Sequence, residues 1–210
     1  MKAVLFAAVS AAAILTLAAC GSGTSAPGDS SSAMPSGMSM PATSAPAGAA
    51  ASGPHNSADA DFATNMIPHH QQAIDMADLA LTKSANADVK RFATRIKAAQ
   101  SPEINAMTGW LTAWKVPVPT TSMDHDMPGM AMPGQMSDAD MAALRRATGA
   151  AFDKMWLELM IKHHDGAIDM AKTELSEGQN ASAKSLAQSI IAGQSAEIAQ
   201  FRKLLPTVGA

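Results

Sequence analysis

The spacing of apolar residues along the chain predicts a helical protein. Between about residues 58 and 114, and again between 138 and 205, apolar side chains recur every three or four positions, as they do along amphipathic helices. We expect Pro68 to bend the first of these helices and Gly149 to interrupt the third. The pattern predicts four helices, over about residues 58–82, 85–114, 138–177 and 181–205.

The helical stretches form an internal repeat at a constant offset of 94 positions. Residues 62–81 match 156–175 at ten of twenty positions, and residues 89–105 match 183–199 at eight of seventeen. Two helices per repeat, joined by a short turn, make one helical hairpin. The predicted fold class is therefore all-α, a ferritin-like four-helix bundle made of two duplicated hairpins and joined by one longer crossover.

The first 57 residues differ in kind from the rest. Residues 1–20 combine Lys2, a short apolar run and small residues before Cys20, which is typical of a bacterial lipoprotein signal peptide. We expect lipid on Cys20 to anchor the protein at the extracytoplasmic face of the membrane. Residues 21–57 are mostly Gly, Ser, Ala, Thr and Pro, which predicts a disordered tether. The expected divisions are signal 1–20, tether 21–57 and domain 58–210, with repeat 1 at about 61–114, crossover 115–137 and repeat 2 at about 138–206.

Each repeat places two histidines on the apolar face of its first helix. His69 and His70 recur as His163 and His164. On the same apolar face, Met66 and Met160 come three residues before these pairs, and Met76 and Met170 lie at the edge of the face. The partner helices carry Glu103 and Glu197 on their inward faces. A carboxylate in an apolar stripe requires a cation or strong donors. The candidate ligands are His69, His70, His163, His164, Met66, Met160, Met76 and Met170, with Glu103 and Glu197 as further ligands or as partners of the histidines.

Two interpretations of this face differ in what the histidines do. In one copy alone, a His pair and a Met at helical spacing are more typical of a packed core with internal hydrogen bonds. Two copies of Met-x-x-His-His, each with an inward Glu, favour a transition-metal centre instead.

The predicted crossover favours copper as the metal. It is unusually rich in methionine, and thioether sulfur selects Cu(I) while imidazole binds both oxidation states. Di-iron bundles instead use Glu-x-x-His motifs, and the His helices here have none. Low-complexity drift or sacrificial oxidation of methionine is the alternative explanation of the crossover. The auxiliary Cu(I) ligands would be Met123, His125, Met127, Met130, Met132 and Met136, and the tether adds Met34, Met38, Met40 and His55.

Composition excludes several other classes of function. The formal net charge is −3, which gives no positive patch for nucleic acid. Cys20 is the single cysteine, so no disulfide or thiolate site is available. No Ser–His–Asp, Cys–His or phosphate-loop arrangement is present, and we expect no organic cofactor and no enzymatic activity.

The repeated Met-Ile-x-His-His-x-x-Ala-Ile-Asp-Met-Ala motif, with Met-Pro-Gly-Met before its second copy, resembles an extracytoplasmic family called domain of unknown function 305. The resemblance covers about residues 61–205. It implies a ferritin-like bundle, an association with copper binding and copper tolerance, and a ligand pool drawn from the four histidines and the motif methionines.

The sequence therefore predicts a lipid-anchored protein that binds copper outside the cytoplasm, to buffer it or to pass it to an envelope partner. Two rival functions remain open. A metal-dependent enzyme would use the same centre, with Glu103 or Glu197 as acid or base. An interaction module would keep the His–Glu core for structure alone and would not respond to metal.

Overall fold

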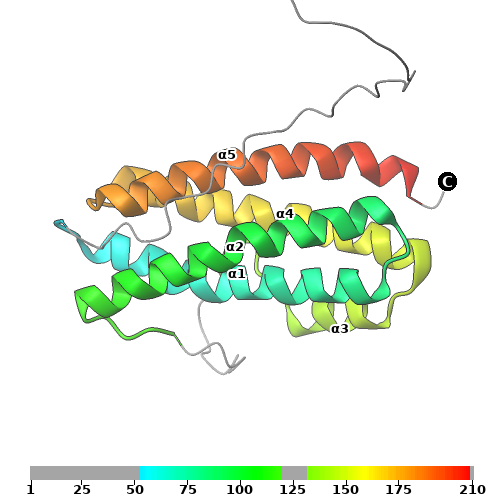
Figure 1. The fold of residues 1–210 in the computed structure, drawn as a ribbon, viewed down its shortest axis with the longest axis horizontal. Coiled ribbons are helices and arrows are strands. Elements are labelled where there is room, and N and C mark those ends of the chain that lie inside the picture. The colour runs from blue at the N-terminus through cyan, green and yellow to red at the C-terminus, as the bar shows by residue number, and fades with distance from the viewer. Residues whose placement is uncertain (1–52, 120–131, 209–210) are drawn as a thin grey trace, which may run out of the picture. The chain divides into compact units, whose positions relative to one another are not determined.

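A computed structural model describes residues 53–119 and 132–208 of the 210-residue chain, and these residues form a helical bundle (Figure 1). Helices α1 and α2 form one hairpin, α4 and α5 form the other, and α1 packs against α4. The predicted all-α fold built from two hairpins is confirmed. The elements are α1 (Ser57–Lys83), α2 (Ala87–Trp114), α3 (Asp138–Arg146), α4 (Gly149–Glu177), α5 (Ala181–Leu204) and the 3-10 turn η1 (Leu205–Thr207).

Asparagine caps fix where the helices of each hairpin begin. The side chain of Asn86 accepts hydrogen bonds from the first backbone N–H groups of α2, and Asn180 does the same for α5. These two positions are 94 residues apart, so the cap belongs to the repeat. Asn56 caps α1 through a reciprocal pair of hydrogen bonds with Asp59. The observed helices begin and end within about two residues of the predicted bounds because these local signals are strong.

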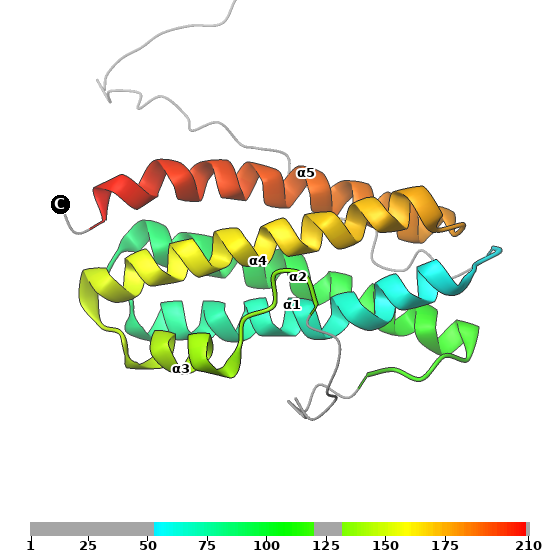
Figure 2. The same cartoon turned by 180° about the vertical axis from the view of Figure 1, so that it is seen from behind.

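The second repeat contains one helix more than a simple hairpin. The predicted interruption near Gly149 is real, because α3 ends at Arg146 and α4 begins at Gly149, whose φ is +57°. Short helix α3 packs Met141 and Leu144 into the core. The equivalent positions of the first repeat, 44–52, lie outside the described residues. By contrast α1 continues through Pro68 as one helix, and it changes direction along its length (Figure 2).

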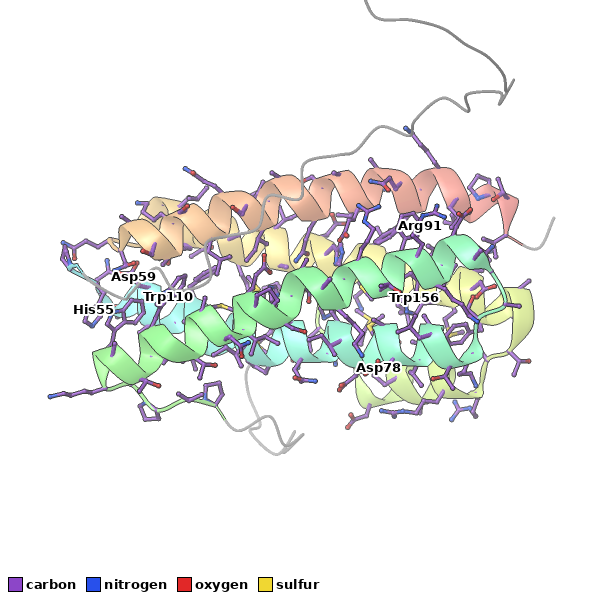
Figure 3. All side chains as sticks on the ribbon, in the orientation of Figure 1. His55, Asp59, Asp78, Arg91, Trp110 and Trp156 are labelled. Carbon is purple, nitrogen blue, oxygen red and sulfur yellow. The ribbon has the colours of Figure 1, made fainter. Side chains whose placement is uncertain are left out.

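The core divides into two apolar clusters, one towards each end of the bundle. Cluster one holds Trp156 and cluster two holds Trp110, and these labelled side chains lie at opposite ends of the bundle in Figure 3. Along α1, residues up to Ile67 belong to cluster two and residues from Ala73 belong to cluster one. The adjacent histidines therefore lie in a layer between the two clusters.

Several sequence predictions concern residues outside the described ranges. Within residues 53–119 and 132–208, no helix is long and apolar enough to cross a membrane. The signal peptide, most of the tether and most of the Met-rich crossover lie outside these ranges, and so do Cys20, Met34, Met38, Met40, Met123, His125, Met127 and Met130.

Candidate metal centre

Four buried histidines occupy the contact between the two hairpins. His69 and His70 come from α1, His163 and His164 come from α4, and each is at most 1% exposed. The rings of His69 and His163 touch, with centroids 3.8 Å apart and planes inclined by 39°. The internal repeat thus brings equivalent residues of its two copies together at one point, because α1 and α4 pack against each other.

The other two histidines each contact a glutamate of their own hairpin. The Nε2 atom of His70 lies 2.7 Å from Oε2 of Glu103 on α2, and that of His164 lies 2.8 Å from Oε2 of Glu197 on α5. The two carboxylates keep 14% and 13% of their side-chain surface exposed. A carboxylate accepts hydrogen bonds, so Nε2 of each imidazole donates to it and Nδ1 is the ring nitrogen that faces away from the glutamate.

The remaining ring nitrogens have few partners. Nε2 of His69 lies 3.2 Å from the carbonyl oxygen of Pro133, so this nitrogen donates and Nδ1 keeps a lone pair. Among the described residues, no hydrogen-bond partner exists for Nδ1 of any of the four histidines, nor for Nε2 of His163. A buried polar atom without a partner costs about 1–3 kcal/mol. Five such atoms in one layer fit a centre whose ring nitrogens receive a ligand.

The electrostatics of the layer keep His69 and His163 neutral. Burial lowers the pKa of His69 to about 3, and the neighbouring His70 and His164 lower it further. Burial likewise lowers the pKa of His163 well below its ordinary value, and the adjacent His69 adds to the effect. Neutral rings have lone pairs available for a metal at physiological and mildly acidic pH.

The candidate methionines are distributed around this layer. Met66 lies in cluster two, Met160 and Met76 lie in cluster one, and all three are fully buried. Met170 is half-buried and lines a small surface cavity with Phe62. Sulfur is therefore available on both sides of the histidines.

The histidines and carboxylates alone do not form a closed cage. Within the described part of the chain, no three His, Cys, Asp or Glu side chains are arranged to hold a metal ion together. A metal in this layer would need two histidine ligands, added methionine sulfur, or rotation of the rings.

The described end of the Met-rich crossover departs from the expected exposed loop. Met132 is half-buried, and Met136 is only 2% exposed, in cluster one. Hydrogen bonds between the Met136 backbone and Gln72 hold this residue against α1, so Met136 is buried and not on an exposed loop. Its role as a Cu(I) ligand stays a prediction. His55, expected in the tether, stacks on Trp114 with ring centroids 4.6 Å apart.

Sequence reasoning missed a buried carboxyl pair between α1 and the end of α4. Asp59 accepts hydrogen bonds from the backbone of Asn56, Gln179 and Asn180 at 2.7–3.0 Å. Burial raises the pKa of Asp59, but these hydrogen bonds and the neighbouring Glu174 together bring it below its ordinary value. Burial and the Asp59 carboxylate raise the pKa of Glu174 to about 8. The signal was present in the sequence, because Glu174 follows Ala167 and Ala171 on the inward stripe of α4.

Known structures similar to this chain include a protein of the DUF305 family and several metal-bound forms of CopM. A Streptomyces coelicolor protein of the DUF305 family, described as secreted, is 34% identical, with a TM-score of 0.66 over 73% of this chain and 94% of that one. CopM in its Cu(I)-bound form is 34% identical, with a TM-score of 0.60 over 72% of this chain and 98% of CopM. CopM in its Cu(II)-bound form is 35% identical, with a TM-score of 0.62 over 71% and 96%. Silver-bound CopM is also similar.

No match was found among curated proteins. The family described as Domain of unknown function (DUF305) matches residues 59–205, which include every helix from α2 to α5 and nearly all of α1. The matched residues also include all four buried histidines and both glutamates that contact them. This chain therefore belongs to the DUF305 family.

Proposed function

We propose that the protein binds copper in the histidine layer between its two hairpins, and so buffers copper outside the cytoplasm or passes it on. The observation that carries this proposal is the set of five buried ring nitrogens without a hydrogen-bond partner within the described residues. A purely structural core would pair such atoms with each other or with backbone groups. CopM, a relative with the same fold, has been crystallised with Cu(I), Cu(II) and silver.

The chemistry of the layer favours Cu(I). Neutral imidazole and thioether sulfur are ligands for this soft cation, and Met66 and Met160 are buried close to the histidine pairs along their helices. A single positive charge costs less to bury than two. Glu103 and Glu197 each contact a histidine and would balance the charge of a metal that the rings hold.

The proposed activity is capture of the metal, without turnover. Glu103 and Glu197, which the sequence offered as acid or base for a rival enzyme, are each hydrogen-bonded to a histidine ring. A carboxylate in that position orients its histidine and fixes Nε2 as the nitrogen that donates to it. The partner that would deliver or receive the copper is proposed to be another protein of the cell envelope.

Anaerobic titration of the purified protein with Cu(I) tests the proposal. We expect metal to remain bound after desalting, and the melting temperature to rise with the free metal concentration as RT ln(1 + [L]/Kd). The same titration with Cu(II) and Zn(II) measures selectivity. Retention of no Cu(I), together with an unchanged melting temperature, would leave the histidine layer as a structural core and refute the proposal.

We also propose that lipid on Cys20 anchors the protein. The support is the sequence before it, in which Lys2, a short apolar run and small residues lead to Cys20. We expect Cys20→Ala to release the protein from the membrane fraction into the soluble fraction, because the variant lacks the thiol to which the lipid would be attached. Fractionation followed by immunoblotting measures the distribution. Ser22→Ala, two residues away, is the matched control and should stay with the membrane. Membrane association of Cys20→Ala equal to that of the original protein would contradict the anchor.

A further inference from the structure

A short segment before α3 is held against the histidine layer from two sides. Gln72 of α1 is 3% exposed, and its side-chain amide makes two hydrogen bonds with the backbone of Met136. Nε2 of Gln72 donates to the Met136 carbonyl at 2.9 Å, and Oε1 accepts from the Met136 N–H at 2.7 Å. We call residues 132–136 the strap. Figure 2 shows the chain before α3 crossing to the middle of α4.

On its other side, the strap backbone lies so close to the α4 backbone that only glycine fits at the contact. A Cβ atom on Gly166 would lie 2.1 Å from the carbonyl oxygen of Pro133. Gly134 has a φ of +73°, and a Cβ there would lie 2.7 Å from the carbonyl oxygen of Lys162. The strap backbone therefore touches the backbone of α4 beside the His163–His164 pair, with no room for a side chain between them.

Both residues that hold the strap are departures from the internal repeat. Gln72 and Gly166 occupy equivalent positions, 94 residues apart, where the two copies differ, although Ala-Ile-Asp-Met-Ala follows in both. In the first copy the position supplies two hydrogen bonds to the strap, and in the second copy it supplies space. One segment thus explains both residues at this position.

The strap makes the two touching histidines unequal. The carbonyl of Pro133 accepts a hydrogen bond from Nε2 of His69, which leaves Nδ1 of that ring with the lone pair. The strap makes no hydrogen bond to the equivalent His163, and the polar group beside that ring is the backbone of His69. The strap therefore holds His69 in one tautomer and does not fix the tautomer of His163.

We propose that Gln72 and Gly166 are positioning residues of the metal centre, which hold the Pro133 carbonyl on Nε2 of His69 and thereby fix Nδ1 as the ligand atom of that ring. The inference rests on the proposed function for its metal, but the tautomer of His69 is a property of the protein without metal. Hydrogen bonds of this kind to metal-binding histidines affect affinity by about 10–100-fold when they are removed.

The test replaces Gln72 with methionine, which has a similar length and lacks the amide. Nitrogen-15 NMR of the histidine rings in metal-free protein should show His69 as the Nε2–H tautomer in the original chain and as a mixture in Gln72→Met. The rings of His70 and His164 should keep their signals, because Glu103 and Glu197 remain in place. Cu(I) affinity should fall about tenfold or more. Gln71→Met, at the half-exposed neighbouring position, is the control and should change neither measurement.

Gly166→Ala provides a second route to the same result, since its Cβ displaces the Pro133 carbonyl while the Gln72 side chain stays. Alanine also favours the helix, so this variant is expected to fold. An unchanged His69 tautomer in both variants would overturn the inference, and so would a changed tautomer with unchanged Cu(I) affinity. Failure of the original chain to bind Cu(I) would refute the proposed function, and the tautomer measurement would still decide whether Gln72 and Gly166 orient His69.

Discussion

Replacing His163 with leucine is expected to abolish the stabilisation of the protein by copper while leaving the metal-free protein folded. His163 is 1% exposed and neither ring nitrogen has a partner within the described residues, so its removal strands no other polar group. A change to an apolar side chain of similar size in a core costs less than about 1.5 kcal/mol, and here it also removes two unpaired polar atoms.

The expected loss of the metal response is large. At a free Cu(I) concentration 100 times Kd, binding stabilises the folded state by about 2.7 kcal/mol. For a domain of this size, that corresponds to a rise of roughly 5–10 °C in melting temperature. Thermal unfolding with and without Cu(I) should show this rise in the original chain and not in His163→Leu.

The control is Gln194→Leu, which removes another buried polar side chain whose Oε1 has no partner in the described part of the molecule. It should keep the full response to Cu(I). A His163→Leu protein that still gains the full increment in melting temperature would place the metal elsewhere. His70→Ala would be a less clean test, because it also removes the hydrogen-bond partner of Glu103.

Replacing Glu174 with glutamine is expected to stabilise the protein above pH 8 and to flatten the dependence of its stability on pH. The pKa of Glu174 is about 8 in the folded protein, against an ordinary value of 4.5. The folded state therefore binds more protons than the unfolded state between these values. The contribution of this carboxyl to stability is complete below about pH 4.5, and it is lost as the pH rises through 8.

The gain from Glu174→Gln should therefore be small at pH 5 and largest near pH 9, on the order of a few kcal/mol. Neutral glutamine avoids burying a second negative charge beside Asp59, whereas nearby Lys184 offsets that charge only in part. Thermal unfolding across pH 5–9 measures the difference. Glu177→Gln is the control: this exposed carboxyl lines the same surface cavity as Glu174, beside Met170, and the variant should match the original protein. Parallel curves for Glu174→Gln and the original chain would show that Glu174 ionises normally.

The helices and the inward histidines were predictable because both depend on local patterns that occur twice. Apolar spacing predicted the helices, and the offset of 94 predicted that His69 and His163 would occupy equivalent places. The burial of Met136 was not predictable in the same way. It depends on Gln72, which is 64 residues away and occupies a position of the repeat at which the two copies differ. Contacts between segments that are distant in sequence leave no periodic signal.

The carboxyl pair shows a related limit. The position of Glu174 on the inward stripe was visible, but its partner Asp59 comes from the first repeat. The short helix α3 could not be inferred from the repeat, since it lies before residue 156, where the match between the two copies begins. Sequence thus predicted what the two copies share, and the structure was needed for what joins them.

The fused duplication has a consequence for symmetry. Two separate copies of one hairpin could pair through the same histidine face, but a symmetric dimer of identical chains must place the same residue at both equivalent positions. Such a dimer could not combine glutamine on one side with glycine on the other. Joining the copies in one chain allows Gln72 and Gly166 to differ, so that a single strap can cross the centre in one direction. Covalent fusion therefore permits a polarity at the centre that assembly from identical subunits would forbid.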